Sequence, residues 1–426
     1  MNIFDSKEYK LSRKAYIAQC TFEYFITLLV ADAYLAKLLS YIGLGDSAIG
    51  IITSLSTFGY LFMLPSVFIA QKIRNVKWTV TPVIALSQLM FMSLYAVPFM
   101  KLPVHINVLL CVFFIFTGHG CHYIFYSVLY KWGNSHVHPQ RRAEFSAGKE
   151  IISLISGMLF TLLIGYLFDK FEEASKPENG FLFAAGAILI LAICNFACLS
   201  IMKNMENEPQ EQSLKFRDVI KNTFCNKGFI SITVLTVLWN IAQGTTIGFL
   251  GIYKTKELAF SIATIQIINI VGNAARVVIS RPLGRYSDKT SFAKGIKLAV
   301  MLAGVAFLIN SFTTPETRWL IVVYTILHSC CIAGTNQNMY NITYSYVPKE
   351  YFSQALAIKN CIGGLFGFAA SLTSGRIVTA VQANSNTFFG VHIYAQQILS
   401  FISFIMCILI IAYITLVVEK QKSIEQ

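Results

Sequence analysis

Twelve long apolar segments, separated by short polar connections, run along this chain of 426 residues. A helix needs ~20 apolar residues to cross the hydrocarbon core of a bilayer, and each segment reaches about that length. The pattern therefore predicts an all-α membrane protein with twelve transmembrane helices. We place them near residues 15–40, 46–70, 78–100, 105–130, 145–168, 180–202, 229–253, 258–283, 293–313, 318–346, 352–380 and 393–418.

A polar, charged segment at 203–228 interrupts this series after the sixth span. It predicts an N-terminal six-helix bundle (1–202), a cytoplasmic linker (203–228) and a C-terminal six-helix bundle (229–426). The two halves also repeat weakly. Three residues of the fifth span match three of the eleventh at one offset of 210 residues: Lys149, Gly157 and Gly165 with Lys359, Gly367 and Gly375. Such pseudo-symmetry is typical of secondary transporters.

Composition agrees with a membrane protein and excludes an ordinary soluble domain. Charged residues make up 13% of the chain, against ~25% in soluble proteins. The net charge of +13 could indicate nucleic-acid binding, but the basic residues gather in alternate connections, as the positive-inside rule describes. We therefore expect no nucleic-acid partner. We expect a multi-pass protein of the plasma (inner) membrane with both termini in the cytoplasm.

Metal and cofactor chemistry finds little support in the sequence. The ten cysteines include no CxxC pair, and most lie within the spans. His119 and His122 form one HxxH pair without the companion acids that a membrane metal centre needs. No phosphate-binding GxxxxGK[ST] loop occurs, so the sequence gives no support for ATP as the energy source. We expect no metal, no cofactor and no enzymatic activity.

The segment between the eighth and ninth spans, RPLGRYSDKTSFAK, carries the most specific motif. Its residues Gly284, Asp288 and Lys289 have the spacing of a cytoplasmic loop of the major facilitator superfamily, which the chain resembles over nearly its whole length. The resemblance implies two six-helix bundles and a gating role for these three residues. The alternative is a basic loop that only obeys the positive-inside rule. The first-half counterpart has Val67 and Gln71 where the family usually has Gly and Asp.

Ionisable residues at bilayer depth are costly, and they are candidates for function. Span 8 carries Gln266, Asn269, Asn273 and Arg276 at helical spacing on one face. In span 1, Glu23 lies on a polar stripe, whereas Asp32 points to the opposite side near the outer end. We expect Lys149, nearer the membrane surface, to anchor the interface.

Further polar residues reach a similar depth in other spans. Gly334–Asn341 is polar enough to predict a locally broken helix in span 10. The proposed substrate-binding set is Arg276, Lys359, Asn240, Gln243, Asn269, Asn273, Asn336, Gln337, Tyr340 and His122, and the proton-coupling set is Glu23 and His119.

The charges within this set allow two interpretations. Arg276 together with Lys359 resembles the oxalate/formate and monocarboxylate-type branches of the superfamily, in which the pair is implied to hold a substrate carboxylate. Alternatively, Arg276 pairs with Glu23 and Lys359 stabilises helix packing. The Asn/Gln-rich cavity would suit sugar hydroxyls equally well.

We predict a secondary active transporter that works by alternating access. Its partners would be a small polar or anionic solute (a carboxylate or a sugar-like compound), protons or a counter-ion, and the lipid bilayer, and it would act as a monomer. Burial can raise the pKa of a carboxyl group, which favours Glu23 as the proton carrier. A multidrug or metabolite exporter of the same fold is the alternative, and a membrane-embedded enzyme or a channel ranks lower.

Overall fold

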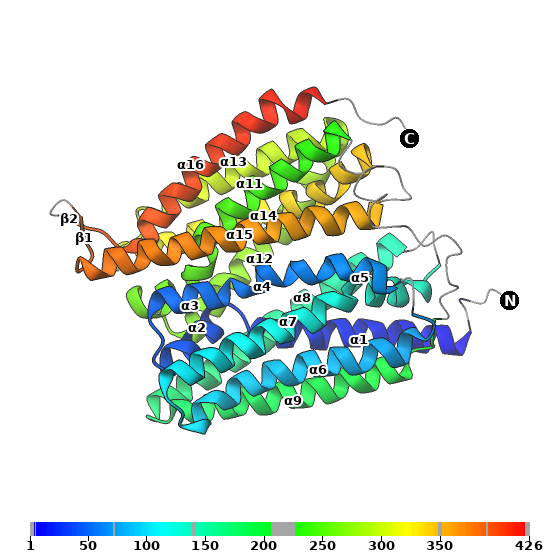
Figure 1. Ribbon diagram of the computed structural model, residues 1–426, viewed down its shortest axis with the longest axis horizontal. Coiled ribbons are helices and arrows are strands. Elements are labelled where there is room, and N and C mark those ends of the chain that lie inside the picture. Colours follow the sequence, from blue (N-terminus) through cyan, green and yellow to red (C-terminus); the bar gives the residue numbers. More distant parts are fainter. Residues whose placement is uncertain are drawn as a thin grey trace. The chain divides into compact units, whose positions relative to one another are not determined.

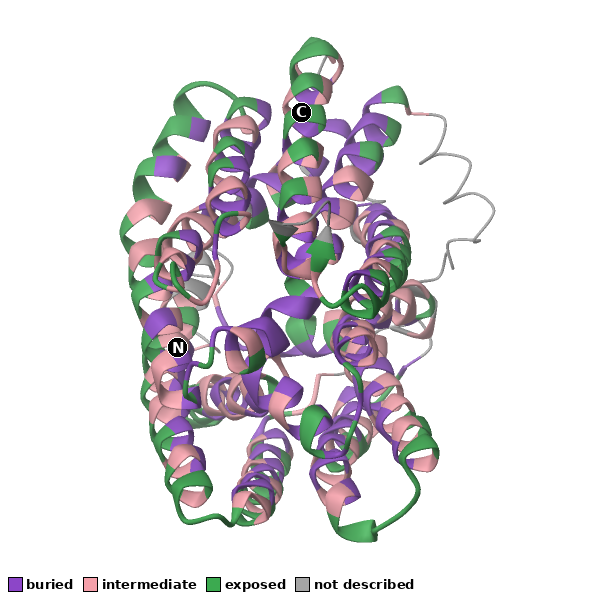
Figure 2. Cartoon of the chain, turned by 90° about the vertical axis from the view of Figure 1, so that its left-hand side faces the viewer, coloured by how far each residue is buried: buried purple, intermediate pink, exposed green. Residues whose placement is uncertain are grey.

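The computed structural model describes residues 4, 6–70, 73–138, 142–205, 226–347, 352–388 and 391–421. Within these ranges, eleven helices are long and apolar enough to cross a membrane. They agree with eleven of the predicted spans and confirm an all-α membrane fold. Figure 2 shows buried and exposed positions alternating around single helices. Exposed stripes such as Ile151, Ile155, Leu159 and Leu163 are apolar, as expected of a surface in contact with lipid.

The described chain forms two compact units. Unit 1 comprises the described residues up to Leu44, those from Phe62 to 205, and Ser261–Gln266, whereas unit 2 comprises Gly45–Leu61 and the remainder from 226 onward. Each half of the sequence thus contributes a short segment to the unit formed mainly by the other half. The division at 203–228 stays a prediction, because residues 206–225 lie outside the described ranges.

Unit 1 is a bundle built around α1. Here α1 packs against α8 and α9, α6 against α7 and α9, and α5 against α7, and Figure 1 shows α6 and α9 side by side. Trp132 and Tyr16 are fully buried at its centre. Its elements are α1 (Lys7–Leu29), α2 (Asp32–Tyr41), α5 (Met63–Ala70), α6 (Val76–Ala96), η3 (Val97–Met100), α7 (Val104–Ser135), α8 (Arg142–Glu173) and α9 (Pro177–Ile201).

The predicted span 15–40 is broken, and it is not among the eleven membrane-length helices. Helix α1 begins in the charged segment at Lys7 and ends at Leu29, and α2 starts at Asp32, whose φ is 45°. The break frees main-chain carbonyls that need new donors. The Tyr95 hydroxyl of α6 donates to the Leu29 carbonyl over 2.6 Å, which stabilises the interruption.

Unit 2 packs α11 against α15 and α16, α13 against α14 and α16, and α3 against α11 and α15. The chain passes from unit 2 to unit 1 through the 3-10 turn η2 (Gly59–Phe62). The other elements are α3 (Asp46–Thr53), α4 (Leu55–Phe58), α11 (Lys227–Ile252), the π-helical turn η5 (Tyr253–Glu257), α12 (Ile262–Lys289), α13 (Phe292–Asn310), α14 (Leu320–Tyr346), α15 (Phe352–Ala383), the antiparallel strands β1 (Thr387–Phe388) and β2 (Val391–His392), α16 (Ala395–Leu416) and η7 (Val418–Lys420). The first turn of α12, up to Gln266, belongs to unit 1.

Two glycines of the sequence repeat make close helix crossings, one in each unit. A Cβ atom on Gly165 of α8 would lie 3.2 Å from the Cα atom of Ala263, at the start of α12. A Cβ atom on Gly375 of α15 would lie 2.7 Å from Ile51 Cδ1 and 2.9 Å from Ser47 Oγ on α3. Small residues at such crossings let helix backbones approach each other.

Two local predictions are wrong. The run Gly334–Asn341 does not break its helix, because α14 is continuous from Leu320 to Tyr346. Its Thr335 hydroxyl bonds within the helix, to the Cys331 carbonyl over 3.1 Å. The motif predicted as a loop is helical up to Lys289, so Gly284, Asp288 and Lys289 lie in the last turns of α12.

Candidate functional site

The polar centre of unit 1 is an acid–base pair between α1 and α7. Glu23 Oε1 lies 2.9 Å from His122 Nδ1, and the two side chains are 18% and 19% exposed. One turn earlier on α1, the Gln19 amide donates to Glu23 Oε2 over 2.7 Å. The spacing of four residues on one helix brings Gln19 and Glu23 to the same face. The arrangement can hold one proton on either partner, as an ion pair or as a neutral pair.

Lys149 of α8 lies close to this pair, next to the Cys20 thiol, and no carboxylate among the described residues contacts it. Its Nζ lies 4.8 Å from the ring centroid of Tyr16 and 5.7 Å from that of Tyr130. Among the described residues, no carboxylate comes within 4 Å of this ammonium group. Its charge is still close enough to interact electrostatically with Glu23. The faces of two aromatic rings therefore hold a cation that retains the capacity to bind an anion.

Lys359 of α15 has a different environment in unit 2. Its side chain is 2% exposed, and its Nζ donates to the Met339 carbonyl over 2.8 Å and to Thr343 Oγ1 over 2.9 Å. Both acceptors belong to the neighbouring helix α14. This geometry fits the alternative in which Lys359 stabilises helix packing.

A second polar contact in unit 2 joins α11 to α14. Gln243 Oε1 lies 3.1 Å from His328 Nε2, and the His328 ring stacks on Tyr324 with centroids 5.4 Å apart. His328 was not among the predicted site residues. The signal was present in the sequence, because His328 is an ionisable residue within a span, as His119 is. Asn240, one turn before Gln243, donates to the Thr236 carbonyl of its own helix over 2.8 Å.

Comparison with known proteins identifies the family. A family model described as Major Facilitator Superfamily matches residues 16–371. This chain belongs to the Major Facilitator Superfamily. It is therefore a multi-pass membrane protein of a transporter family, and its fold is shared by solved transporters. No curated protein matches it.

The structural neighbours of this superfamily member differ widely in sequence, and they support the fold alone. A mutant of the nucleoside transporter NupG is 12% identical with a TM-score of 0.71, and the match covers 96% of this chain and 99% of the other. A POT family transporter in complex with 5-aminolevulinic acid is 14% identical with a TM-score of 0.66, at 95% coverage of both chains. A bacterial homolog of the human lysosomal transporter Spinster is 13% identical with a TM-score of 0.65, at 98% coverage of both.

The predicted site residues of this superfamily member divide between the units. Glu23, His119 and His122 lie in unit 1, and all the others lie in unit 2. His119 is buried, with its ring centroid 5.0 Å from that of Phe91. Glu23 and His122 of the predicted set are in direct ion-pair contact with each other.

On α12, three of the four residues of the predicted stripe are partly exposed, and Gln266 is buried. Arg276, Asn269 and Asn273 are half-buried. On α14, Asn336 and Tyr340 are exposed, and the Tyr340 ring lies 5.2 Å from that of Phe352. The side chain of Gln337 lies outside the described part of the structure. The substrate roles of these residues remain predictions.

The gating roles of Gly284, Asp288 and Lys289 also remain predictions. Asp288 and Lys289 are exposed at the end of α12, and Gly284 is half-buried one turn earlier. In the first half, where the family pattern is interrupted, Gln71 and the side chain of Val67 lie outside the described residues.

Proposed function

We propose that this protein is a proton-coupled secondary transporter that carries a small organic anion of the carboxylate class by alternating access. The observation that carries the proposal is the Glu23–His122 pair beside Lys149, a cation without a carboxylate partner among the described residues. Proton binding and anion binding would thus take place at adjoining groups of unit 1.

Coupling follows from the electrostatics of this cluster. An ionised Glu23 attracts Lys149 and repels an incoming carboxylate, and both effects are strong away from bulk water. A proton on the Glu23–His122 pair removes that repulsion and leaves Lys149 to the solute. Because linkage is reciprocal, a bound anion would raise the proton affinity of the pair by the same factor. Proton and anion would therefore bind together and be released together.

The proposal also includes the solute-binding and gating roles that the sequence predicts for residues of unit 2. Arg276 and the amide side chains of unit 2 would provide further contacts to the solute, and Asp288 and Lys289 would act in gating. The asymmetry of basic residues supports cytoplasmic termini, and a plasma-membrane location is part of the proposal. A neutral polar solute is the second candidate, because Asn269, Asn273 and Gln243 suit hydroxyl groups and a nucleoside transporter shares the fold.

The test is binding followed by uptake. The purified chain would be heated with lactate, succinate or benzoate, and with the matching neutral amides as controls. A ligand at 100 times its Kd stabilises a protein by about 2.7 kcal/mol. Labelled uptake of the stabilising acid into proteoliposomes would then be measured with and without an inward proton gradient.

Two variants separate the proposed roles. We expect Glu23→Gln to abolish proton-driven accumulation while anion exchange continues. We expect Lys149→Gln to raise KM about 10- to 100-fold, because a hydrogen bond to a charged group contributes about 1.5–3 kcal/mol. Lys14→Gln is the matched control, since Lys14 is exposed on α1 of the same unit. Uptake that is indifferent to the proton gradient, or stabilisation by the amides alone, would contradict the proposal.

A further inference from the structure

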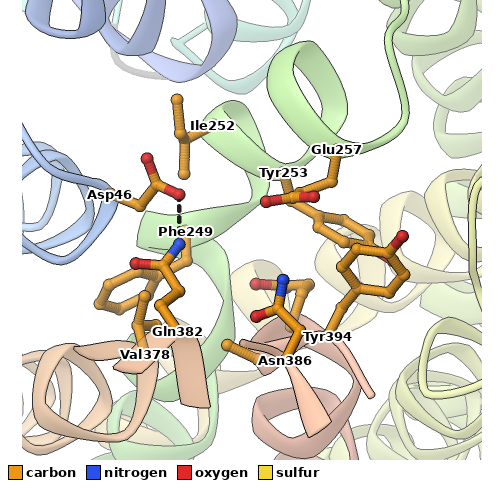
Figure 3. A pocket seen from close by; sticks show the side chains of 11 residues that line it. Asp46, Phe249, Ile252, Tyr253, Glu257, Val378, Gln382, Asn386 and Tyr394 are labelled. Carbon is orange, nitrogen blue, oxygen red and sulfur yellow. Dashed lines mark hydrogen bonds between the residues drawn. The ribbon is translucent and has the colours of Figure 1, made fainter. Parts of the chain in front are cut away.

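A small cavity of ≈ 30 Å³ lies within unit 2, and none of the residues that line it belongs to unit 1. Its walls come from the start of α3, from the end of α11 with η5, from the end of α15 and from the start of α16 with residues just before it. The polar side chains around it are Asp46, Tyr253, Glu257, Gln382, Asn386, Tyr394 and Gln396. Figure 3 shows Asp46 and Gln382 on one side of this space and Glu257 and Tyr394 on the other.

The two carboxylates of the cavity have different partners. Asp46 Oδ1 lies 2.8 Å from Lys256 Nζ, and its other oxygen accepts a hydrogen bond from the Gln382 amide (Figure 3). Glu257 makes no ion pair or hydrogen bond with any residue that the structure describes. Lys256 contacts Asp46 and acts on Glu257 only at longer range, as His392 does, so the half-buried Glu257 carries a negative charge that no cation among the described residues contacts.

A second, independent feature also indicates a missing partner. Gln396 lines the cavity, its side chain is 3% exposed, and its Oε1 accepts no hydrogen bond from the described residues. Its Nε2 makes only a long contact of 3.4 Å to the Thr246 carbonyl. A buried acceptor without a donor costs about 1–3 kcal/mol, so such groups are rare unless a ligand or water satisfies them.

The backbone at the cavity adopts an uncommon conformation. Ser385 and Asn386 have φ values of 53° and 56°, in the left-handed region. Main-chain bonds hold this turn, from Asn386 N to the Val381 carbonyl over 3.0 Å and from Ile393 N to the Asn386 carbonyl over 2.8 Å. Non-glycine residues held in this region tend to occur at functional sites. Here the turn places the Asn386 side chain at the cavity (Figure 3).

We propose that this cavity binds a monovalent metal cation, with the Glu257 carboxylate and the Gln396 Oε1 atom as ligands and Asn386 and Tyr394 completing an oxygen shell. Carboxylate and amide oxygens are the ligands that hard cations prefer. One carboxylate that no described cation contacts matches one positive charge. The volume admits a cation with one or two waters, because each water needs about 10–15 Å³. The site differs from the proposed proton and solute site, and it does not depend on that proposal.

The test uses the full chain, purified without alkali cations in choline chloride. The midpoint of thermal unfolding would be recorded during titration with NaCl or KCl at constant ionic strength, and ²²Na⁺ binding would be measured on the same preparation. We expect saturable stabilisation by one of the two metal cations and none by choline. Glu257→Gln and Gln396→Met should each weaken binding tenfold or more.

Glu316→Gln is the matched control, because Glu316 acts electrostatically on Tyr253 and Tyr394 but does not line the cavity. It should change the affinity less than twofold. Equal unfolding midpoints in all salts would overturn the proposal, and so would a shift that survives in Glu257→Gln. Stabilisation through Glu257 by ethanolamine or by lower pH alone would also overturn it, in favour of an organic ammonium ion or a proton.

Discussion

Lys149 and Lys359 occupy matching positions in the two halves of the sequence, yet their environments are opposite. Lys149 is half-buried between the rings of Tyr16 and Tyr130, and no carboxylate partner is described for it. Lys359 is enclosed, and α14 provides acceptors for two of its three protons. The same side chain thus has no contacting carboxylate among the described residues of unit 1, whereas in unit 2 it is part of the helix packing.

The difference originates in the facing helices. In unit 1, α7 and α1 present aromatic rings to α8, and a ring face attracts an ammonium group without saturating its donors. In unit 2, α14 presents a carbonyl and a hydroxyl to α15, and hydrogen bonds to both satisfy the ammonium group at the cost of removing it from water. Pseudo-symmetry thus repeats the residue without repeating its role.

The largest expected effect tests the structural role of Lys359. We expect Lys359→Ala to lower the free energy of unfolding by about 2–4 kcal/mol, because it leaves a cavity in a closely packed region. Lys359→Met keeps the volume and removes the buried charge, so its loss should be below about 1.5 kcal/mol. Thermal unfolding of both variants measures the difference. Equal losses would show that the charge, and not the volume, stabilises this region.

The glycine crossings extend the comparison to the backbone. We expect Gly165→Ala to lower stability by about 1–2 kcal/mol, because the new methyl group would meet the main chain of Ala263, which cannot rotate away. Gly375→Ala should cost less than about 1 kcal/mol, since the ends of Ile51 and Ser47 can move and alanine favours helix. The same unfolding assay ranks the two, and the reverse order would refute this account of the crossings.

His136 allows a third test outside the membrane spans. Like Lys359 it is buried, at 2% exposure, and neither ring nitrogen has a hydrogen-bond partner among the described residues. Burial, aided by the charges of Lys203 and Arg13, lowers the pKa of His136 to about 4. The unfolded chain, with an ordinary histidine pKa of ~6.5, then binds more protons between these two values.

Stability should consequently fall as the pH drops through that window. Between pH 7 and pH 5 we expect this residue to lower the free energy of unfolding by about 1–2 kcal/mol. His136→Phe should flatten the pH dependence, and the exposed His105→Phe should leave it unchanged. If the free energy of unfolding depended on pH equally in the unchanged protein and in both variants, His136 would be ruled out as the source of that dependence.

The smallest stability effect is expected at Lys149 itself. Lys149→Met should lower the free energy of unfolding by about 1 kcal/mol or less, since cation–π contacts at partly exposed sites contribute about 0.5–1 kcal/mol each. We nevertheless expect Lys149→Met to show the same rise in the KM of uptake as Lys149→Gln. A loss as large as that of Lys359→Ala would make the two lysines equivalent and would remove the reason to assign Lys149 to the solute.

The helices could be predicted because the bilayer imposes a simple rule. Backbone groups in lipid must be bonded internally, so apolar runs of spanning length become helices. The rule fails where side chains far apart in sequence decide the outcome. The apolar span 15–40 is interrupted after Leu29, where the Tyr95 hydroxyl of α6 bonds to the freed carbonyl. The polar run Gly334–Asn341, by contrast, stays helical within α14.

The candidate site was predicted in part. Glu23 and His122 were chosen as ionisable residues at bilayer depth, and the structure brings them to 2.9 Å from each other. Lys149 was assigned to the interface, because depth along one helix does not reveal the aromatic rings that face it. Residues 45–61 belong to unit 2 and residues 261–266 to unit 1. Sequence periodicity could not predict this, because it identifies the faces of a helix but not the helices that pack against them.

The sequence alone determined that this chain is a helical membrane protein of two related halves, because apolar length, charge asymmetry and repeat spacing are properties of single segments. Only the tertiary structure decided which ionisable groups have partners. The aromatic surroundings of Lys149, the enclosure of Lys359 and the isolation of Glu257 all depend on atoms from other helices, and the energy of a buried charge is set by those neighbours.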